Sequence, residues 1–398
     1  MVTFLGVHKL LGKDDIQSDD RRTLYYNQVV KTWDFIIIGG GVIGLSLAWR
    51  LRRNGASVLV VEKGEPAREA TYAAGGMIAH CDPHNPPALA DMIAASARMY
   101  PEFVRELRDE AFESPDLRDA GTIAFFEAGE TPNCPGARSL DDGELFRVEP
   151  LIALRGRAYW LPERSVDPRK LGSALEKAAR NRGADFATGS AVTEVAVLGG
   201  RATGVRTTKS FYAAGAVVNC AGAWAAQIMP FGAPARPVKG QMLCVVPAHP
   251  TPAKEAWVRH PQEAHHPGPL IQHTIRTPEV YIIPRSDGRI ILGATVEEAG
   301  FDKRVDPDTV QHLHRAADNV VPEIGKMRIH DAWAGLRPGT PDGLSILGAT
   351  AMSGYFVATG HYRDGILLAP ITAKLLTELL TGQPIEFDLA PFSLQRFG

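Results

Sequence analysis

The chain lacks the long apolar run that a membrane-spanning helix needs. About 20 consecutive apolar residues are required, and no stretch reaches that length although 45% of the 398 residues are hydrophobic. The N-terminus also lacks a basic segment followed by an apolar core, so no secretory signal is predicted. We therefore expect a cytoplasmic protein with no membrane partner.

An excess of charge of one sign is also missing. The 43 Lys and Arg residues nearly balance the 45 Asp and Glu residues, for a formal net charge of -2. Binding to nucleic acid or to an anionic membrane surface usually needs a basic excess. We expect no nucleic-acid partner.

Cysteine is scarce, with only Cys81, Cys134, Cys220 and Cys244. Their spacing has none of the close pairs that are typical of zinc sites. Cys81 and Cys220 lie in small or apolar sequence, which predicts buried reduced thiols. We expect no disulfide and no metal site.

The most informative feature that is present is the segment of residues 35–62. An apolar run at residues 35–38 predicts a buried strand, and the glycine-rich sequence 39–44 (GGGVIG) follows at once. Gly39 suits a tight turn, Gly41 a close approach to a pyrophosphate, and Gly44 close packing of the next helix. The helix N-terminus would then bind the phosphates.

The same segment continues as a dinucleotide-binding unit should. Asn54 and Gly55 end the predicted helix, and residues 57–61 form a second apolar strand. Glu62 follows, where a carboxylate would accept hydrogen bonds from an unphosphorylated ribose. The segment predicts a dinucleotide but leaves NAD and FAD open.

The rest of the chain changes character twice. Helices are expected within residues 86–108 and 168–182, the latter with Asp167 as N-cap, and Gly199-Gly200 predicts a hairpin. From residue 236 to about 330, alternating strands indicate an antiparallel sheet, and residues 355–380 return to a strand, turn and helix. We predict an α/β fold in which a mainly antiparallel β (α+β) substrate domain interrupts a Rossmann-like dinucleotide-binding domain. The expected boundaries are 1–31 for an N-terminal extension, 32–108, 165–235 and 331–398 for the dinucleotide-binding domain, and 109–164 and 236–330 for the substrate domain.

Three separated motifs resemble one family. Residues 39–44, 70–77 (ATYAAGGM) and 333–340 (WAGLRPGT) with 359–370 (TGHYRDGILLAP) are similar to the glycine oxidases of the D-amino-acid oxidase superfamily. The resemblance implies FAD as the cofactor, and oxidative deamination of glycine and other small amines such as sarcosine and D-alanine. It also implies supply of the glycine imine for the thiazole of thiamine.

The resemblance also assigns residues to the cofactor. Lys63 falls beside Glu62 at the ADP portion, and residues 361–367 would approach the flavin ring at a helix N-terminus, which favours negative charge there. An ordinary helix-entry loop is the alternative for these last residues. The expected FAD contacts are Gly39, Gly41, Val42, Ile43, Gly44, Glu62, Lys63, Ala70, Thr71, Gly75, Gly76, Met77, Val192, His361, Tyr362, Arg363, Asp364, Gly365, Ile366 and Leu367.

Three side chains match the family's substrate contacts. Arg337 matches the carboxylate clamp, since a bidentate guanidinium fixes a planar carboxylate. Tyr281 matches a second carboxylate contact through its hydroxyl, and Arg363 an arginine close to flavin and substrate. The alternatives are a solvated loop for Arg337, packing for Tyr281 and an ion pair with Asp364 for Arg363. Trp333 and Met77 either bound the pocket or belong to the core.

Two residues beside the flavin loop are left without a catalytic role. A substrate amine that arrives neutral needs no general base, so His361 is not assigned as one. Asp364 stands where the family commonly has asparagine, and a carboxylate pointing at the flavin would oppose negative charge on the ring. No cysteine follows Cys244, so we expect non-covalent FAD.

Other functions remain open on sequence grounds. A FAD-dependent D-amino-acid dehydrogenase would share the fold and the hydride step but use an acceptor other than oxygen. A flavin-binding protein without turnover would need neither Arg337 nor Tyr281. We expect a small amino acid and oxygen as partners, and a homo-oligomer, for which the tetramer is the common state of the family.

Overall fold

The computed structural model describes residues 31–127, 129–132, 134–248 and 269–398. Contacts divide the chain into Met1–Lys31 and Thr32–Gly398, and everything below concerns the second unit. The predicted N-terminal extension lies outside the described residues, apart from Lys31.

The first sheet is the predicted nucleotide-binding sheet. Its strand order is β17-β18-β11-β1-β2-β8, and the β9–β10 hairpin continues from β11. The pairs β18–β11, β11–β1, β1–β2 and β2–β8 are parallel, whereas β17 pairs antiparallel with β18. The strands are β1 (Thr32–Ile38), β2 (Val58–Val61), β8 (Asp185–Ala187), β9 (Val192–Leu198), β10 (Arg201–Thr207), β11 (Phe211–Asn219), β17 (Ile346–Ala349) and β18 (Tyr355–Thr359).

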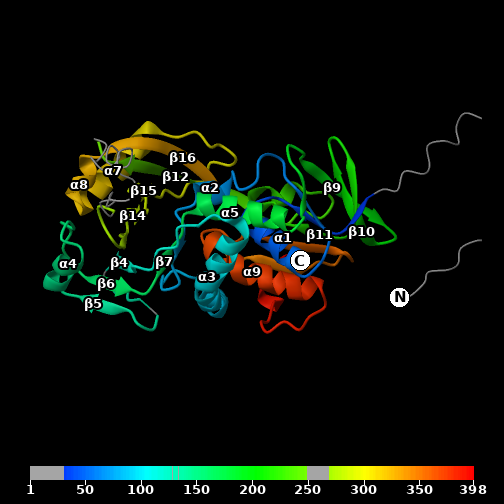
Figure 1. The fold of residues 1–398 in the computed structure, drawn as a ribbon, viewed down its shortest axis with the longest axis horizontal. Coiled ribbons are helices and arrows are strands. Elements are labelled where there is room, and N and C mark those ends of the chain that lie inside the picture. The colour runs from blue at the N-terminus through cyan, green and yellow to red at the C-terminus, as the bar shows by residue number, and fades with distance from the viewer. Residues whose placement is uncertain (1–30, 128, 133, 249–268) are drawn as a thin grey trace, which may run out of the picture. The chain divides into compact units, whose positions relative to one another are not determined.

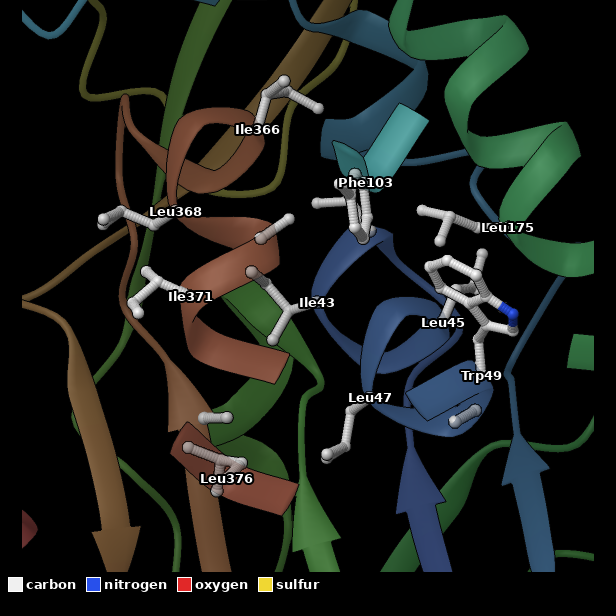
Figure 2. Close-up of a cluster of buried hydrophobic side chains, with 14 of the residues drawn as sticks. Ile43, Leu45, Leu47, Trp49, Phe103, Leu175, Ile366, Leu368, Ile371 and Leu376 are labelled. Carbon is white, nitrogen blue, oxygen red and sulfur yellow. The ribbon is translucent and has the colours of Figure 1, made fainter. Parts of the chain in front are cut away.

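Four helices pack together beside this sheet (Figure 1). They are α1 (Val42–Arg53), α3 (Ala90–Ala111), α5 (Pro168–Asn181) and α9 (Gly365–Leu380). Asp167 caps α5 as predicted, accepting from the N–H groups of Arg169 and Lys170. Figure 2 shows the apolar contact: Leu45, Leu47 and Trp49 of α1 lie among side chains of α9, Phe103 of α3 and Leu175 of α5. This core fixes the end of α1 that follows the glycine loop.

The second sheet is mainly antiparallel, as predicted. Its order is β16-β12-β15-β14-β13-β4-β6-β5, and β13–β4 is its one parallel pair within the described chain. The strands are β4 (Thr122–Phe125), β5 (Arg138–Leu140), β6 (Ala158–Leu161), β12 (Arg236–Val246), β13 (Thr274–Arg276), β14 (Tyr281–Pro284), β15 (Ile290–Gly293) and β16 (Arg328–Gly339).

The two faces of this sheet have different neighbours. Leu243 and Val245 of β12 pack with Leu313 of α7 (Pro307–Val320) in one apolar cluster. Met242 and Cys244 alternate with them and join a second cluster on the opposite face. The helix therefore covers one face, and the other is free to line a site.

Short elements complete the unit. They are α2 (Ala70–Ala73), α4 (Asp142–Val148), α8 (Pro322–Gly325), β3 (Met77–Ile78), β7 (Arg164–Ser165), η1 (Pro87–Leu89), η2 (Gly222–Gln227), η3 (Ala390–Phe392) and η4 (Leu394–Phe397). Among the described residues, none of the helices combines the length and the apolar character that crossing a bilayer requires.

The strand pairing groups one segment differently from the predicted domain boundaries. β16 crosses the boundary at residue 330, yet it pairs with β12 from Arg328 to Gly339. By hydrogen bonding, residues 331–339 thus belong with the second sheet. The division into domains itself remains a proposal.

The expectation of four reduced thiols is wrong for one pair. Cys81 and Cys134 form a disulfide with their Cα atoms 5.1 Å apart, across a sequence separation of 53 residues. The fold brings the segment after β3 next to the segment between β4 and β5, which sequence spacing cannot reveal. Cys220 and Cys244 are free and buried, as expected for Cys220.

Candidate active site

The glycine loop joins β1 to α1 with little room for side chains. Gly39 has a φ of +101°, and a Cβ there would lie 2.5 Å from the Cys220 carbonyl oxygen. A Cβ on Gly44 would overlap the carbonyl oxygen of Gly39. Both positions therefore require glycine, for the turn and for the close approach of helix to strand.

The N-terminus of α1 opens at this loop. Its first hydrogen bond runs from the Leu45 N–H to the Gly41 carbonyl oxygen, at 2.9 Å. The earlier N–H groups have no partner inside the helix, and that of Val42 donates to Thr71 Oγ1 at 2.9 Å. The N–H groups of Ile43 and Gly44 are the donors that a pyrophosphate would use.

Glu62 is buried at the end of β2 and holds the loop. One carboxylate oxygen accepts from the Gly40 N–H at 2.7 Å, and the other from the Gly64 N–H at 2.9 Å. Each oxygen keeps a further lone pair for a ribose hydroxyl. Glu62 thus fixes the backbone as well as offering the predicted acceptor.

A cavity at this loop gathers the residues predicted for the ADP portion. Ser190 immediately precedes Ala191, which lines the cavity. Its hydroxyl is buried and has no hydrogen-bond partner among the described residues. A glycine cradle, a helix N-terminus and a buried carboxylate together fit the ADP half of FAD. The predicted residues that line the cavity are Gly39, Gly41, Glu62, Lys63, Ala70, Thr71 and Val192.

The segment Gly75 to Met77 lies against the second sheet and the connection from β7 to α5. A Cβ on Gly75 would lie 2.8 Å from Ile283 Cδ1, and one on Gly76, at a φ of +80°, would overlap the Val166 carbonyl oxygen. Arg285, fully buried on the strand end of β14, donates to the Gly75 carbonyl oxygen at 2.6 Å. The second sheet therefore fixes the backbone that is predicted to run beside the isoalloxazine.

Arg337 on β16 has its guanidinium flat over the neighbouring strand β12. A Cβ on Gly240 would overlap its guanidinium atoms. Nη1 donates to the carbonyl oxygens of Thr295, at 2.9 Å, and Lys239, at 3.3 Å. Burial lowers the pKa of Arg337, yet a guanidinium stays charged. The solvated-loop alternative for this arginine is wrong, because the residue lies on a strand and its half-buried side chain is fixed by two hydrogen bonds.

Tyr281 and Arg363 meet at the same site. Arg363 Nη2 donates to the Tyr281 hydroxyl at 2.9 Å, although their segments are far apart in sequence. Arg337 bonds the Thr295 carbonyl oxygen, two residues beyond Gly293, which is the strand partner of Tyr281. The three predicted substrate contacts thus come from neighbouring segments.

An apolar wall adjoins these polar groups. Met77, Tyr281 and Trp333 pack against Met242 and Ile283 in one cluster. Trp333 Nε1 donates to the Ala73 carbonyl oxygen at 3.1 Å, which fixes the indole. Met77 and Trp333 are therefore half-buried members of this cluster, and their place at the boundary of a substrate pocket remains a proposal.

The loop before α9 divides its residues between site and core. Tyr362 has a φ of +46° and its N–H donates to the Pro338 carbonyl oxygen at 3.0 Å. The side chains of Ile366 and Leu367 are buried in the helical core, as Figure 2 shows for Ile366. These two residues therefore have only backbone groups to offer a flavin, and Gly365 begins α9 between them and the site.

His361 and Asp364 flank this loop with opposite pKa shifts. Burial lowers the pKa of His361 to about 3, and its Nε2 lies 3.1 Å from Thr372 Oγ1. A neutral, hydrogen-bonded histidine agrees with leaving it out as a base. Burial, reinforced by Asp82 and opposed by Arg363, raises the pKa of Asp364 to about 6.

Sequence reasoning missed several residues that shape the site. Gly240 carried a usable signal, because a glycine inside a predicted strand often marks a close approach. Thr295, Lys239 and Arg285 act through main-chain contacts or burial that no motif marks. Trp224, Glu69 and Leu336 line the cavity as well.

The fold and the site define a dinucleotide-dependent oxidoreductase, with a nucleotide cradle at one end and the side chains of Arg337, Tyr281 and Arg363 at the other. The profile of the FAD dependent oxidoreductases (DAO) matches residues 34–379. The chain therefore belongs to this family, is an FAD-dependent oxidoreductase of the glycine oxidase type, and uses FAD.

Individual relatives agree with this assignment. The chain is 33% identical to the glycine oxidase of Geobacillus kaustophilus, over 92% of this chain and 97% of the relative. It is 32% identical to the hydrogen cyanide synthase subunit HcnC of Pseudomonas aeruginosa, again over 92% and 97%. It is 35% identical to the bifunctional protein ThiO/ThiG of Synechocystis sp., where 92% of the chain spans only 54% of the relative.

A solved structure shows the same fold. The crystal structure of glycine oxidase from Geobacillus kaustophilus superposes with a TM-score of 0.80 at 32% identity, covering 92% of this chain and 99% of that one. The predicted fold class is thereby confirmed. Iminodiacetate oxidase from Chelativorans sp. BNC1, at 24% identity and a TM-score of 0.78, shares the fold.

Proposed function

We propose that the protein oxidises glycine and other small amines, such as sarcosine and D-alanine, to the oxo acid, ammonia or amine, and hydrogen peroxide. We propose further that it supplies the glycine imine for the thiazole of thiamine. Relatives named glycine oxidase and ThiO/ThiG, at 33% and 35% identity, support both parts. The observation that supports the proposal is the hydrogen bond of Arg363 to Tyr281, beside the strand segment whose Thr295 carbonyl oxygen accepts from Arg337.

Arg337 is the anchor for the substrate carboxylate. Its Nη1 is occupied by the Thr295 and Lys239 carbonyl oxygens, which aim the planar guanidinium and keep it from turning. A charged donor held in this way fixes a carboxylate in position and plane. Tyr281 donates a second hydrogen bond to the same carboxylate, while Arg363 holds the tyrosine hydroxyl.

The reaction needs orientation more than proton transfer from the protein. FAD, when bound, accepts the hydride from the substrate Cα. A substrate amine that enters neutral needs no base, and the pKa of His361, at about 3, leaves that residue neutral. The protein's main contribution is therefore to hold Cα at one place beside the cofactor.

Met77 and Trp333 restrict the size of the substrate. Both pack against the β12 and β14 side chains in a fixed cluster, and the indole is held by its bond to Ala73. A fixed apolar wall leaves little room beyond Cα, which favours glycine and other small amines over bulky amino acids.

The test is an anaerobic amino-acid panel. Glycine, sarcosine and D-alanine should each be added to the FAD-loaded protein, and flavin absorbance recorded. We expect glycine to bleach the flavin and air to restore it with formation of peroxide. A flavin that stays oxidised with all three amines contradicts the proposal.

A second candidate is a dehydrogenase that passes electrons to an acceptor other than oxygen. The chain is also 32% identical to the hydrogen cyanide synthase subunit HcnC over 97% of that relative, so its relatives carry the names of more than one activity. Glycine would still bleach the flavin, but an artificial acceptor would restore colour much faster than air. Cyanide among the products of glycine would point to the HcnC type.

The remaining expectations belong to this proposal as well. A small amino acid and oxygen are the proposed partners, FAD is proposed to be non-covalent, and a homo-oligomer, with the tetramer common in the family, is the proposed assembly. Precipitation with acid tests the attachment, because non-covalent flavin stays in the supernatant.

A further inference from the structure

The residues that line one side of the ADP cavity rest on a segment of the other sheet. The connection between β15 and α7, residues 294–306, contacts two of them, Glu69 and Trp224, and both contact a third lining residue, Lys63. The contact with Glu69 is polar and the contact with Trp224 is aromatic. We call residues 296–305 the β15–α7 loop.

The polar contact is a chain of three alternating charges. Lys303 Nζ lies 2.9 Å from Glu69 Oε2, and Glu69 Oε1 lies 3.1 Å from Lys63 Nζ. Glu69 immediately precedes α2, whose Ala70 and Thr71 line the cavity. Lys303 and Lys63 therefore both neutralise the Glu69 carboxylate, which lies next to the predicted phosphate end of the site.

The aromatic contact is made with Trp224, on the same side of the cavity. The Phe301 ring lies 5.4 Å from the Trp224 ring, centroid to centroid, with 35° between the planes. Lys63 Nζ lies 3.1 Å from the centroid of the Trp224 ring, so the two contacts meet at Lys63. Phe301 is 44% exposed and Trp224 is half-buried, so the contact between the two rings lies near the surface.

The loop is anchored to its own sheet at both ends. Glu297 forms an ion pair with buried Lys239 at 3.2 Å, and the backbones of these two residues exchange hydrogen bonds. At the other end the Asp306 N–H donates to Gln241 Oε1 at 2.7 Å. Phe301 and Lys303 are thus presented from a fixed base rather than from a free loop.

We propose that the β15–α7 loop is a clasp for the ADP half of FAD, with Phe301 and Lys303 as positioning residues that act through Trp224 and Glu69. Lys303 neutralises Glu69, which otherwise repels the pyrophosphate. Phe301 holds the Trp224 ring and, through it, the Lys63 ammonium at the cavity wall. The clasp slows FAD release whichever amine is oxidised, so it does not depend on the proposed substrate.

The test measures FAD release from the loaded protein after dilution, by the rise of flavin fluorescence. Lys303→Glu should raise the rate of release by about tenfold, because two carboxylates then face each other, and Phe301→Ala by about threefold. Arg304→Glu is the matched control: it makes the same charge change in the same loop, but Arg304 is paired only with Asp302, at 2.7 Å, in the described chain. This control should release FAD at the rate of the parent protein.

Three further measurements separate a clasp from general damage. The effect of Lys303→Glu should shrink in 0.5 M salt, whereas that of Phe301→Ala should persist. Lys303→Met should have a small effect in the parent protein and none in a Glu69→Gln background, and Lys303→Arg should restore slow release. The melting temperature of the FAD-free variants should match that of Arg304→Glu.

Two outcomes overturn the proposal. One is a rate of FAD release in Lys303→Glu and Phe301→Ala equal to that in Arg304→Glu. The other is an effect of Lys303→Met that remains undiminished in the Glu69→Gln background, since the lysine would then not act through that carboxylate.

Discussion

The two ends of the FAD site are built in different ways. At the ADP end, the glycine loop and Glu62 belong to one strand–helix–strand unit, and Thr71 follows a few residues later in α2. At the substrate end, Tyr281, Arg337 and Arg363 come from β14, β16 and the loop before α9, and they meet only in the folded chain. Nearby residues in the sequence are enough to specify the core of the ADP end. The substrate end also depends on strands whose own residues do not contact the substrate.

The largest effect should follow from removing the anchor at the substrate end. Arg337→Ala removes the guanidinium proposed to bind the substrate carboxylate through two charged hydrogen bonds. We expect a loss of about 3 kcal/mol in transition-state binding, or about 100-fold in kcat/KM. We expect most of it as a higher KM for glycine, measured by steady-state kinetics. FAD affinity, measured by fluorescence titration, should stay within about twofold of the parent value because the ADP end is untouched. An unchanged KM would remove Arg337 from the substrate site.

A single methyl group tests whether the anchor depends on its neighbour strand. In Gly240→Ala the new Cβ overlaps the Arg337 guanidinium, so the side chain must leave its place. We expect kcat/KM for glycine to fall by about 10- to 30-fold, less than in Arg337→Ala because the charge remains nearby. The double variant should be no worse than Arg337→Ala alone.

The matched control for that change is a glycine with open space. A Cβ on Gly288 would meet nothing within 4 Å, but Gly288 has a φ of +84°, so Gly288→Asn keeps a residue that tolerates this backbone. It should leave the kinetics of the enzyme unchanged. If the losses in kcat/KM of Gly240→Ala and Arg337→Ala add up in the double variant, Gly240 affects the kinetics otherwise than through Arg337.

The same contrast explains what the sequence could and could not predict. The Rossmann-like unit followed from the order of apolar strand, glycines, helix and acid, because each part has a local cause. The β9–β10 hairpin and the N-cap at Asp167 also followed from local turn and cap residues. Arg337 was found only through a family motif, since its direction is set by Thr295 and Gly240 on other segments.

The disulfide is the clearest case of a feature beyond sequence reasoning. Cys81 and Cys134 lie in irregular segments whose approach depends on how β3 and β4 are placed. Apolar neighbours around Cys81 indicated burial, which is correct, but burial does not distinguish a thiol from a disulfide. The β15–α7 loop is similar, because its contacts join two sheets and leave no periodic pattern.

A change at the ADP end should act on cofactor affinity and leave the substrate end intact. Glu62→Gln weakens two hydrogen bonds to backbone N–H groups and the predicted bonds to the ribose, so we expect FAD to bind about tenfold more weakly. Fluorescence titration of the FAD-free protein measures this. Glu65→Gln, an exposed carboxylate that pairs with Arg68, is the control and should bind like the parent. A raised KM for glycine at saturating FAD would break the separation of the two ends.

The last effect concerns stability and lies at Asp364, in the loop before α9. Its pKa in the folded protein, about 6, is above the ordinary value of 3.8 because burial disfavours the carboxylate. Between these values the folded state binds more protons than the unfolded state, so its stability falls as pH rises from about 4 to above 6. Asp364→Asn removes this loss and should stabilise the FAD-free protein at pH 7 by about 1 to 3 kcal/mol, with little difference at pH 4.

Urea unfolding at pH 4, 5, 6 and 7 measures this difference, and Asp308→Asn, an exposed carboxylate in the first turn of α7, should show no such trend. The N-terminus of α9 favours a negative charge on Asp364 by a few tenths of a kcal/mol, which opposes the expected gain. A variant that is less stable than the parent at pH 7 would show that this helix end, rather than burial, decides the state of Asp364. The carboxylate would then be charged beside the flavin loop, and the substrate end would carry a negative group that its arginines must balance.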